Sequence, residues 1–184
     1  MSFLNMYFAE GFEEVEALTV VDLLRRAGIR VDMVSISGDL VVKGSHGIRV
    51  VCDRMFDDAE EADGLILPGG MPGTTYLKEH KGLDAVIRDY DAKGKLLAAI
   101  CAAPTVFGEM GLLKDREACC YPGLEPRLLR ARVSHEPVTV CGNLVTSRGV
   151  GTAIAFALEI ITILTDKKTA DEIAYGVVYT EQDR

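Results

Sequence analysis

The stretch Leu96-Leu97-Ala98-Ala99-Ile100-Cys101-Ala102-Ala103-Pro104-Thr105 joins a wholly apolar run to a segment that favours a helix. Leu96–Ile100 has the length and composition of a buried strand. Pro104 suits the first turn of a helix, where its missing N–H costs nothing. Cys101 stands alone at the junction, and its neighbours are small, as a tight turn requires. The stretch therefore predicts a nucleophile elbow, in which the cysteine side chain projects from a strand-to-helix turn.

Outward from this elbow, strands and helices alternate along the chain. The predicted strands are Phe3–Phe8, 30–36, Gly64–Leu67 and Leu96–Ile100, with hairpins over 40–51 and 139–146. The predicted helices cover about 15–26, 83–92, 102–110, 151–164 and 169–175. Apolar strands followed by helices indicate parallel pairing with both sheet faces covered. We therefore expect a single α/β domain over residues 1–184, built as a three-layer sandwich with a mostly parallel central sheet.

Composition excludes several classes of partner. The chain has 184 residues with 20 basic and 28 acidic side chains, a formal net charge of −8. An acidic domain without a basic run is a poor candidate for nucleic acid or an anionic membrane surface. No apolar run reaches the roughly 18–20 residues of a membrane span. Five cysteines without an export signal indicate reduced thiols, so we expect a cytoplasmic protein.

Three polar or glycine-rich segments follow predicted strands, where ligands sit in open α/β sheets. They are 10–16, 68–73 and the elbow at Cys101. Unpaired N–H groups and a helix dipole would lower the pKa of a cysteine at this point. Gly69 and Gly70 can bring backbone close to the sulfur, and the N–H groups of Gly70 and Ala102 could form an oxyanion hole. The plainer interpretations are a small buried cysteine and a simple tight turn.

Several motifs together resemble one family, in the same order and over nearly the whole chain. They are Glu10-Gly11-Phe12-Glu13-Glu14-Val15-Glu16, Leu67-Pro68-Gly69-Gly70, Ala99-Ile100-Cys101-Ala102-Ala103-Pro104, Cys120-Tyr121-Pro122-Gly123 and Thr146-Ser147-Arg148-Gly149-Val150-Gly151-Thr152. This set is similar to the ThiJ/PfpI superfamily, in the branch of the parkinsonism-linked deglycase and its bacterial relatives. The resemblance implies a flavodoxin-like sandwich, a homodimer, a reactive Cys101 and a protonated Glu16 against its sulfur. Without the resemblance, the glutamates are ordinary carboxylates near a helix N-terminus.

The chain departs from the family pattern at three positions. Ala102 stands where the protease-like branch has a histidine, so a Cys-His peptidase mechanism is doubtful. Tyr121 stands where some relatives carry a histidine near the sulfur, and it would orient a substrate or only pack. His46 takes the place of an arginine that some relatives put near the pocket, so we expect anion recognition to differ from theirs.

Other motifs predict no cofactor or metal. His46, His80 and His135 are scattered and far from any cysteine at metal-ligand spacing. Cys119 and Cys120 do not form a C-x-x-C pair; one of them could resolve an oxidised Cys101, although packed thiols are the simpler interpretation. Gly149-Val150-Gly151 lacks the third glycine of a dinucleotide loop, which favours a structural helix entry.

Two classes of function remain. A thiolate, a neutral carboxylic acid and an oxyanion hole suit an enzyme acting on a small reactive carbonyl, and the resemblance implies glutathione-independent glyoxalase or deglycase activity. The alternative is a redox-sensing or chaperone-like stress protein that uses oxidation of Cys101. An amidase or peptidase, and the thiazole-monophosphate-biosynthesis role attached to many relatives, are further alternatives that the sequence supports less.

Overall fold

A computed structural model describes residues 2–180, and its centre is a seven-stranded sheet. The strand order is β10-β11-β7-β6-β1-β2-β5, and every neighbouring pair is parallel except the antiparallel hairpin of β10 and β11. These strands are β1 (Phe3–Phe8), β2 (Arg30–Ser35), β5 (Arg54–Met55), β6 (Gly64–Leu67), β7 (Leu96–Ile100), β10 (Val138–Cys141) and β11 (Leu144–Ser147). The predicted mostly parallel sheet is confirmed.

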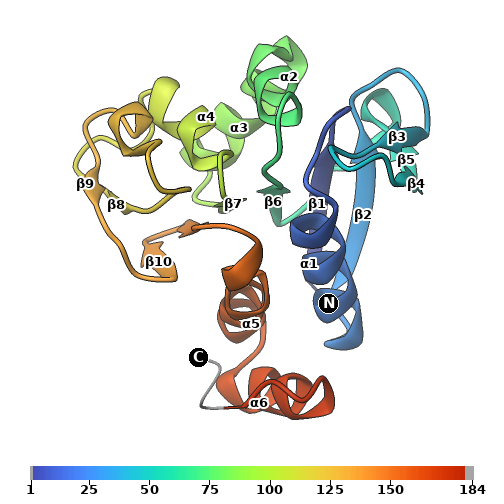
Figure 1. The fold of residues 1–184 in the computed structure, drawn as a ribbon, viewed down its shortest axis with the longest axis vertical. Helices are drawn as coiled ribbons and strands as arrows, with labels where there is room; N and C mark the ends of the chain where they lie inside the picture. Colours follow the sequence, from blue (N-terminus) through green and yellow to red (C-terminus); the bar gives the residue numbers. More distant parts are fainter. Residues whose placement is uncertain (1, 181–184) are drawn as a thin grey trace.

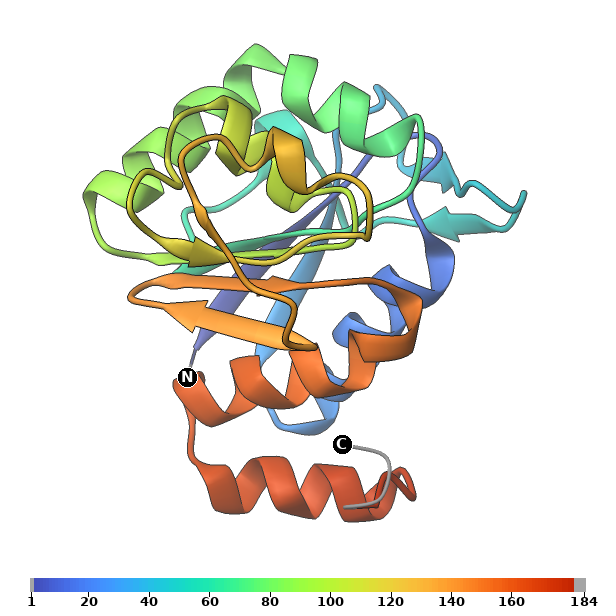
Figure 2. The same cartoon turned by 60° about the vertical axis from the view of Figure 1, so that its left-hand side comes forward.

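Helices cover both faces of the sheet (Figures 1 and 2). One face carries α1 (Glu14–Arg26) and α5 (Ala153–Leu164), with α6 (Lys167–Gly176) packed outside α5. The other face carries α2 (Gly73–Glu79), α3 (Lys81–Ala92) and α4 (Pro104–Glu109). This is the expected three-layer sandwich.

Alternating side chains of the strands divide the core into two layers. Met6, Ile66 and Ile100 point toward the α1–α5 layer, and their neighbours Leu65 and Leu67 point toward the α2–α4 layer. All five side chains are fully buried. Strands buried on both faces read as continuous apolar runs, which is why the sequence predicted them as parallel.

The order of the strands places a crevice beside β1. The chain passes from β1 to β2 on one side, and then returns to pair β6 with the other side of β1. Loops that leave β1 and β6 therefore diverge at their carboxyl ends, the usual ligand site of open α/β sheets. Because β7 and β11 extend the same parallel array, their carboxyl ends reach this edge too.

Several elements differ from the prediction. The sequence analysis missed α2, the short parallel pair β8 (Glu117–Ala118) and β9 (Arg132–Val133), and three 3₁₀ turns at Phe56–Asp58, Glu125–Arg127 and Val150–Thr152. The predicted 40–51 hairpin is present as β3 (Val41–Lys43) and β4 (Arg49–Val51), but it forms a separate sheet. Within residues 2–180, no helix has the length and apolar character needed to cross a membrane.

Candidate active site

Cys101 occupies the predicted elbow in a strained backbone conformation. Its φ is 65°, in the left-handed region that costs a residue with a side chain roughly 1–3 kcal/mol. Two backbone hydrogen bonds hold it there: the Cys101 N–H donates to the Ser147 carbonyl at 3.0 Å, and its carbonyl accepts from the Tyr121 N–H at 2.8 Å. Strain held in this way by neighbouring segments turns the Cys101 side chain toward the crevice.

The helix after the elbow begins later than predicted. The sequence suggested a helix over 102–110, whereas α4 begins at Pro104, and a turn separates it from Cys101. The Cys101 sulfur interacts with the Glu16 carboxyl and with the backbone N–H groups of Gly70 and Ala102, and the two N–H groups lower the pKa of the thiol. These are the two groups predicted to form an oxyanion hole, and in the free protein they point at the thiol itself.

Glu16 reaches the same sulfur from the first turn of α1. Its side chain is fully buried, Oε2 accepts from the Gly69 N–H at 3.1 Å, and the carboxyl interacts with the Cys101 side chain. Oε1 is also buried and has no hydrogen-bond partner among residues 2–180. The structure thus brings together Cys101, Glu16, Gly69, Gly70 and Ala102, as the sequence analysis expected.

Glycine is required at both positions of the 69–70 pair. A Cβ on Gly69 would lie 2.5 Å from the Cys101 Cβ and 2.6 Å from Glu16 Oε2. A Cβ on Gly70, whose φ is 92°, would lie 2.4 Å from the Glu13 backbone nitrogen. Real Cβ atoms do not approach other atoms this closely, so a side chain at Gly69 would displace Cys101 or Glu16, and one at Gly70 would displace the backbone of residues 11–13.

Burial makes a second charge in this site costly. Burial, with a smaller contribution from the nearby Glu13 carboxylate, raises the pKa of Glu16 to about 7 against the lowering effect of hydrogen bonds from Cys101 and Gly69. Burial, together with the charge of an ionised Glu16, raises the pKa of the Cys101 thiol to about 12. Two groups in contact that disfavour each other's charge titrate as a pair. Around neutral pH the pair carries one negative charge.

The hydrogen-bond partners favour the sulfur as the place of that charge. Two N–H groups, from Gly70 and Ala102, donate to Sγ, whereas the Glu16 carboxyl receives one and leaves Oε1 unpartnered. A buried carboxylate with an unsatisfied oxygen is costly. If Glu16 keeps the proton, it donates to the thiolate, and the part of the rise in the thiol pKa that comes from the charge of Glu16 disappears, while the larger part that comes from burial remains. Hydrogen bonds from Glu16, Gly70 and Ala102 would therefore oppose the effect of burial on the pKa of Cys101. They take the place of the helix dipole that the sequence suggested.

The pair forms part of the wall of a cavity of about 570 Å³. Tyr121 lines it and is half exposed, so it stands in the predicted pocket position. The sequence analysis missed the contribution of Arg148 and Gly149, which also line the cavity. The sequence offered only the Gly142-Asn143 turn, which indicated a hairpin. It did not indicate that the second strand of the hairpin would pair in parallel with β7 and so bring these residues to the cavity.

His46 lies outside this cavity and binds the first turn of α1 instead. Its ring Nδ1 lies 2.9 Å from Glu14 Oε2, and its backbone N–H donates to Glu14 Oε1 at 2.7 Å. Although burial opposes it, hydrogen bonds from His46 and Ile48 lower the pKa of Glu14 to about 2. Glu13, Glu14 and His46 bring ligand atoms within 4.8 Å of one another, enough to hold a metal ion in principle. Their atoms already hydrogen-bond, so they tie the β3–β4 hairpin to α1.

The other thiols lack the surroundings of Cys101. Cys119 and Cys120 are buried, and their contacts are with Thr146 and the Tyr121 carbonyl. Burial raises the pKa of Cys52 and Cys120 to about 12. A raised thiol pKa therefore does not distinguish Cys101 from these cysteines. What distinguishes Cys101 is the adjacent Glu16 carboxyl and the two backbone N–H groups beside its sulfur.

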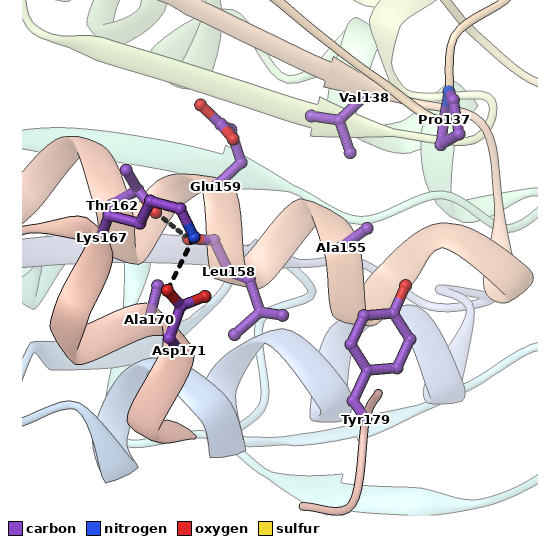
Figure 3. Close-up of a pocket in the computed structure, with 10 residues that line it drawn as sticks. All are labelled: Pro137, Val138, Ala155, Leu158, Glu159, Thr162, Lys167, Ala170, Asp171 and Tyr179. Atoms are coloured by element: carbon purple, nitrogen blue, oxygen red, sulfur yellow. Dashed lines mark hydrogen bonds and ion pairs between the residues drawn. The ribbon is translucent and has the colours of Figure 1, made fainter. Parts of the chain in front are cut away.

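A second cavity, of about 330 Å³, lies between β10, α5 and α6 (Figure 3). Its rim carries Glu159, Lys167 and Asp171, with the Lys167–Asp171 ion pair at 2.7 Å, and Tyr179 closes one end. The described residues that line it include no thiol or imidazole. Of these two cavities, and among the described residues, the Cys101 cavity is the one whose lining combines a thiol with a buried carboxyl group.

A model of the DJ-1/PfpI family matches residues 4–163. The chain belongs to the DJ-1/PfpI family. Protein DJ-1 homolog B of Arabidopsis thaliana, a family relative, is 38% identical over 174 residues, which is 92% of this chain but 40% of that protein. Another relative, glutathione-independent glyoxalase DJR-1.2 of Caenorhabditis elegans, is 32% identical over 159 residues, 84% of each protein. The solved structure of oxidized DJ-1 from Toxoplasma gondii, 34% identical, superposes with a TM-score of 0.95, covering 98% of this chain and 100% of that one.

If the charge lies on the sulfur, two Glu16 variants should change the pKa of the Cys101 thiol by different amounts. Glu16→Leu removes the donor, so we expect the pKa of the Cys101 thiol to rise by about 1 or more relative to the wild type, equivalent to roughly 1.4 kcal/mol. Glu16→Gln keeps an N–H donor and should stay closer to the wild type. Thiolate absorbance in the ultraviolet, recorded against pH with Cys101→Ser as the baseline for the other thiols, measures this. If both variants form the thiolate at lower pH than the wild type, Glu16 repels the sulfur as a carboxylate and this account is wrong.

Proposed function

We propose that this DJ-1/PfpI protein is a cysteine-dependent enzyme that converts α-oxoaldehydes to α-hydroxy acids without glutathione. The observation that carries the proposal is the buried Cys101–Glu16 pair on the wall of an open cavity. A family relative named as a glutathione-independent glyoxalase supports the same chemistry. The related deglycase activity would use the same attack on a small reactive carbonyl.

The reaction begins with attack of the Cys101 thiolate on the aldehyde carbon, and the Glu16 proton passes to the aldehyde oxygen. The product of this step is a hemithioacetal. Glu16, now a carboxylate, takes the hydrogen of that carbon as a proton and returns it to the neighbouring carbon, while the hydroxyl proton on the former aldehyde oxygen passes to the ketone oxygen, which leaves a thioester of the α-hydroxy acid and an ionised Glu16. Water hydrolyses the thioester, so that one α-oxoaldehyde and one water give one α-hydroxy acid and the free thiolate. No external oxidant or reductant is needed.

Each contact of the Cys101–Glu16 pair has a role in these reaction steps. The unpartnered Oε1 of Glu16 is available to exchange protons with a substrate, since Oε2 is held by Gly69. The N–H groups of Gly70 and Ala102 support the sulfur in the free protein and would support negative charge on the adjacent oxygen after attack. A peptidase is less well supported, because no histidine is among the described residues that line the cavity.

Substitution of the pair should remove activity. We expect Cys101→Ser to reduce methylglyoxal consumption to the uncatalysed rate, and Glu16→Gln to lower kcat at least about 100-fold, the usual size of a proton-transfer contribution. Cys141→Ser is the matched control, because Cys141 is also a partly exposed free thiol. It lies at the turn of the β10–β11 hairpin, at the other end of β11 from Ser147, which contacts Cys101. A stopped assay of methylglyoxal loss and lactate formation measures all three. Undiminished turnover by Cys101→Ser would contradict the proposal.

A redox-sensing or chaperone-like role is the second candidate, and a specific observation favours it. A solved neighbour is described as oxidized DJ-1, and in this chain the same donors that face the sulfur could bind sulfinate oxygens. Two equivalents of hydrogen peroxide would convert the Cys101 thiolate to a sulfinate, with release of two waters. Glu16 would then donate its proton to a sulfinate oxygen.

Mild peroxide should therefore add two oxygens at Cys101 before it modifies the other thiols. Intact mass and peptide mapping of the wild type measure this, with Cys101→Ser as the control. Glu16→Leu, which removes the proton donor, should shift the product toward the three-oxygen sulfonate. Uniform oxidation of several cysteines would count against this role.

We also propose that the protein forms a homodimer in the cytoplasm, as its sequence led us to expect. Apolar side chains at the start of α1 and on the β3–β4 hairpin support the dimer: Val15, Ile48 and Val51 are each at least half exposed. Sedimentation equilibrium of the wild type and Val51→Asp tests it. A dimer that the substitution weakens supports this face, and a wild-type monomer overturns the proposal.

A further inference from the structure

Gly149 faces the reacting pair across the cavity. A Cβ placed on Gly149 would lie 3.8 Å from the unpartnered Oε1 of Glu16, and 3.5 and 3.9 Å from two carbons of the Tyr121 ring. All three residues line the same cavity as Cys101. A side chain at position 149 would therefore fill the space between the ring of Tyr121 and the carboxyl of Glu16.

The backbone does not demand glycine at this position. Gly149 has φ 161° and ψ −167°, an extended conformation that any residue adopts. The distances from its Cβ position are ordinary van der Waals contacts rather than clashes. Gly69 and Gly70 differ in this respect, since a side chain there would collide with the site. The absence of a side chain at 149 therefore affects the cavity rather than the fold.

The cavity beside Gly149 is large, and apolar side chains form part of its wall together with the charged Glu13 and Arg148. The cavity measures about 570 Å³, within the range of about 300–1,000 Å³ typical of sites for drug-sized ligands, and is more than methylglyoxal needs. Besides the half-exposed ring of Tyr121, its wall includes Pro122, Pro137 and Val150. A flat apolar group that stacks with an offset on the exposed ring of Tyr121 would have its edge at Gly149, where a Cβ would already be in van der Waals contact with that ring.

We propose that Gly149 determines specificity, and that the preferred substrates are α-oxoaldehydes with a flat, apolar substituent, such as arylglyoxals. The substituent lies against Tyr121 and over Gly149, while the aldehyde carbon meets Cys101 and the adjacent carbon lies near Oε1 of Glu16. This inference rests on the proposed function for its reaction, but it makes a separate claim about the shape of the cavity.

The test compares two substrates in three proteins. We expect the wild type to have a higher kcat/KM for phenylglyoxal than for methylglyoxal. Gly149→Ala should lower the ratio of the two values about tenfold, because one carbon in a fitted pocket is worth roughly 10–200-fold. Gly176→Ala is the control, since it adds a methyl group at the end of α6 with nothing within 4 Å. Equal ratios in all three proteins would overturn the inference.

A second measurement separates this inference from the proposed function. Maleimide and N-phenylmaleimide alkylate thiols by the same reaction but differ by a flat ring, and peptide mapping follows their addition to Cys101. We expect Gly149→Ala to slow N-phenylmaleimide about tenfold relative to maleimide. If the wild type turns over no α-oxoaldehyde, the proposed function fails, yet the alkylation ratio still decides the shape of the cavity. An unchanged alkylation ratio overturns the inference whatever the turnover.

Tyr121→Leu gives an independent check should Gly149→Ala fail to fold. It removes the aromatic surface and leaves position 149 untouched. We expect it to lower the preference for phenylglyoxal and for N-phenylmaleimide in parallel. An unchanged preference in both assays would contradict the seating of the substituent against Tyr121.

Discussion

Cys101 and Glu16 meet in a buried space where only one of them can be ionised. Burial raises the pKa of both groups, and the charge of either raises the other. Because the pair must share one negative charge, the surrounding donors decide which atom carries it. The loop amides of Gly70 and Ala102 direct that charge to the sulfur, and the remaining proton stays on Glu16. The reactivity proposed for this protein depends on that division.

The fold supplies this contact by bringing the ends of four parallel strands to one edge. Glu16 follows β1, Gly69 and Gly70 follow β6, Cys101 follows β7, and residues 148–152 follow β11. The two glycines allow loop, carboxyl and thiol to approach more closely than any side chain would permit. This arrangement requires a strained, left-handed backbone at Cys101. Backbone hydrogen bonds with Ser147 and Tyr121 hold that conformation in place.

Most of this arrangement could be predicted from the sequence, because its strongest signals are local. The apolar runs Gly64–Leu67 and Leu96–Ile100 and the small residues around Cys101 report directly on buried strands and a tight turn. The contacts of Glu16 came from family resemblance, since a glutamate in a first helical turn looks the same whether it is exposed or buried. Its burial depends on segments distant in sequence.

What the sequence did not predict depends on long-range pairing. The place of Arg148 and Gly149 in the cavity follows from parallel pairing between β11 and β7, which a hairpin signal does not reveal. The sequence indicated a surface or structural role for His46, but not its partner Glu14, which it meets because the β3–β4 hairpin lies beside α1. The pKa of Cys101 was attributed to a helix dipole, yet α4 begins too late and the donors come from loops.

The protonation state of Glu16 tests the central claim most directly. Infrared difference spectroscopy of the wild type against Glu16→Gln, recorded at about pH 8, above the Glu16 pKa of about 7, shows whether the carbonyl stretch of a protonated, buried carboxyl group persists. The account predicts a carboxylic acid band that is present in the wild type, absent from Glu16→Gln, and weakened at the same pH in Cys101→Ser, where no thiolate keeps the proton on Glu16. A wild-type spectrum with only a carboxylate band would contradict it.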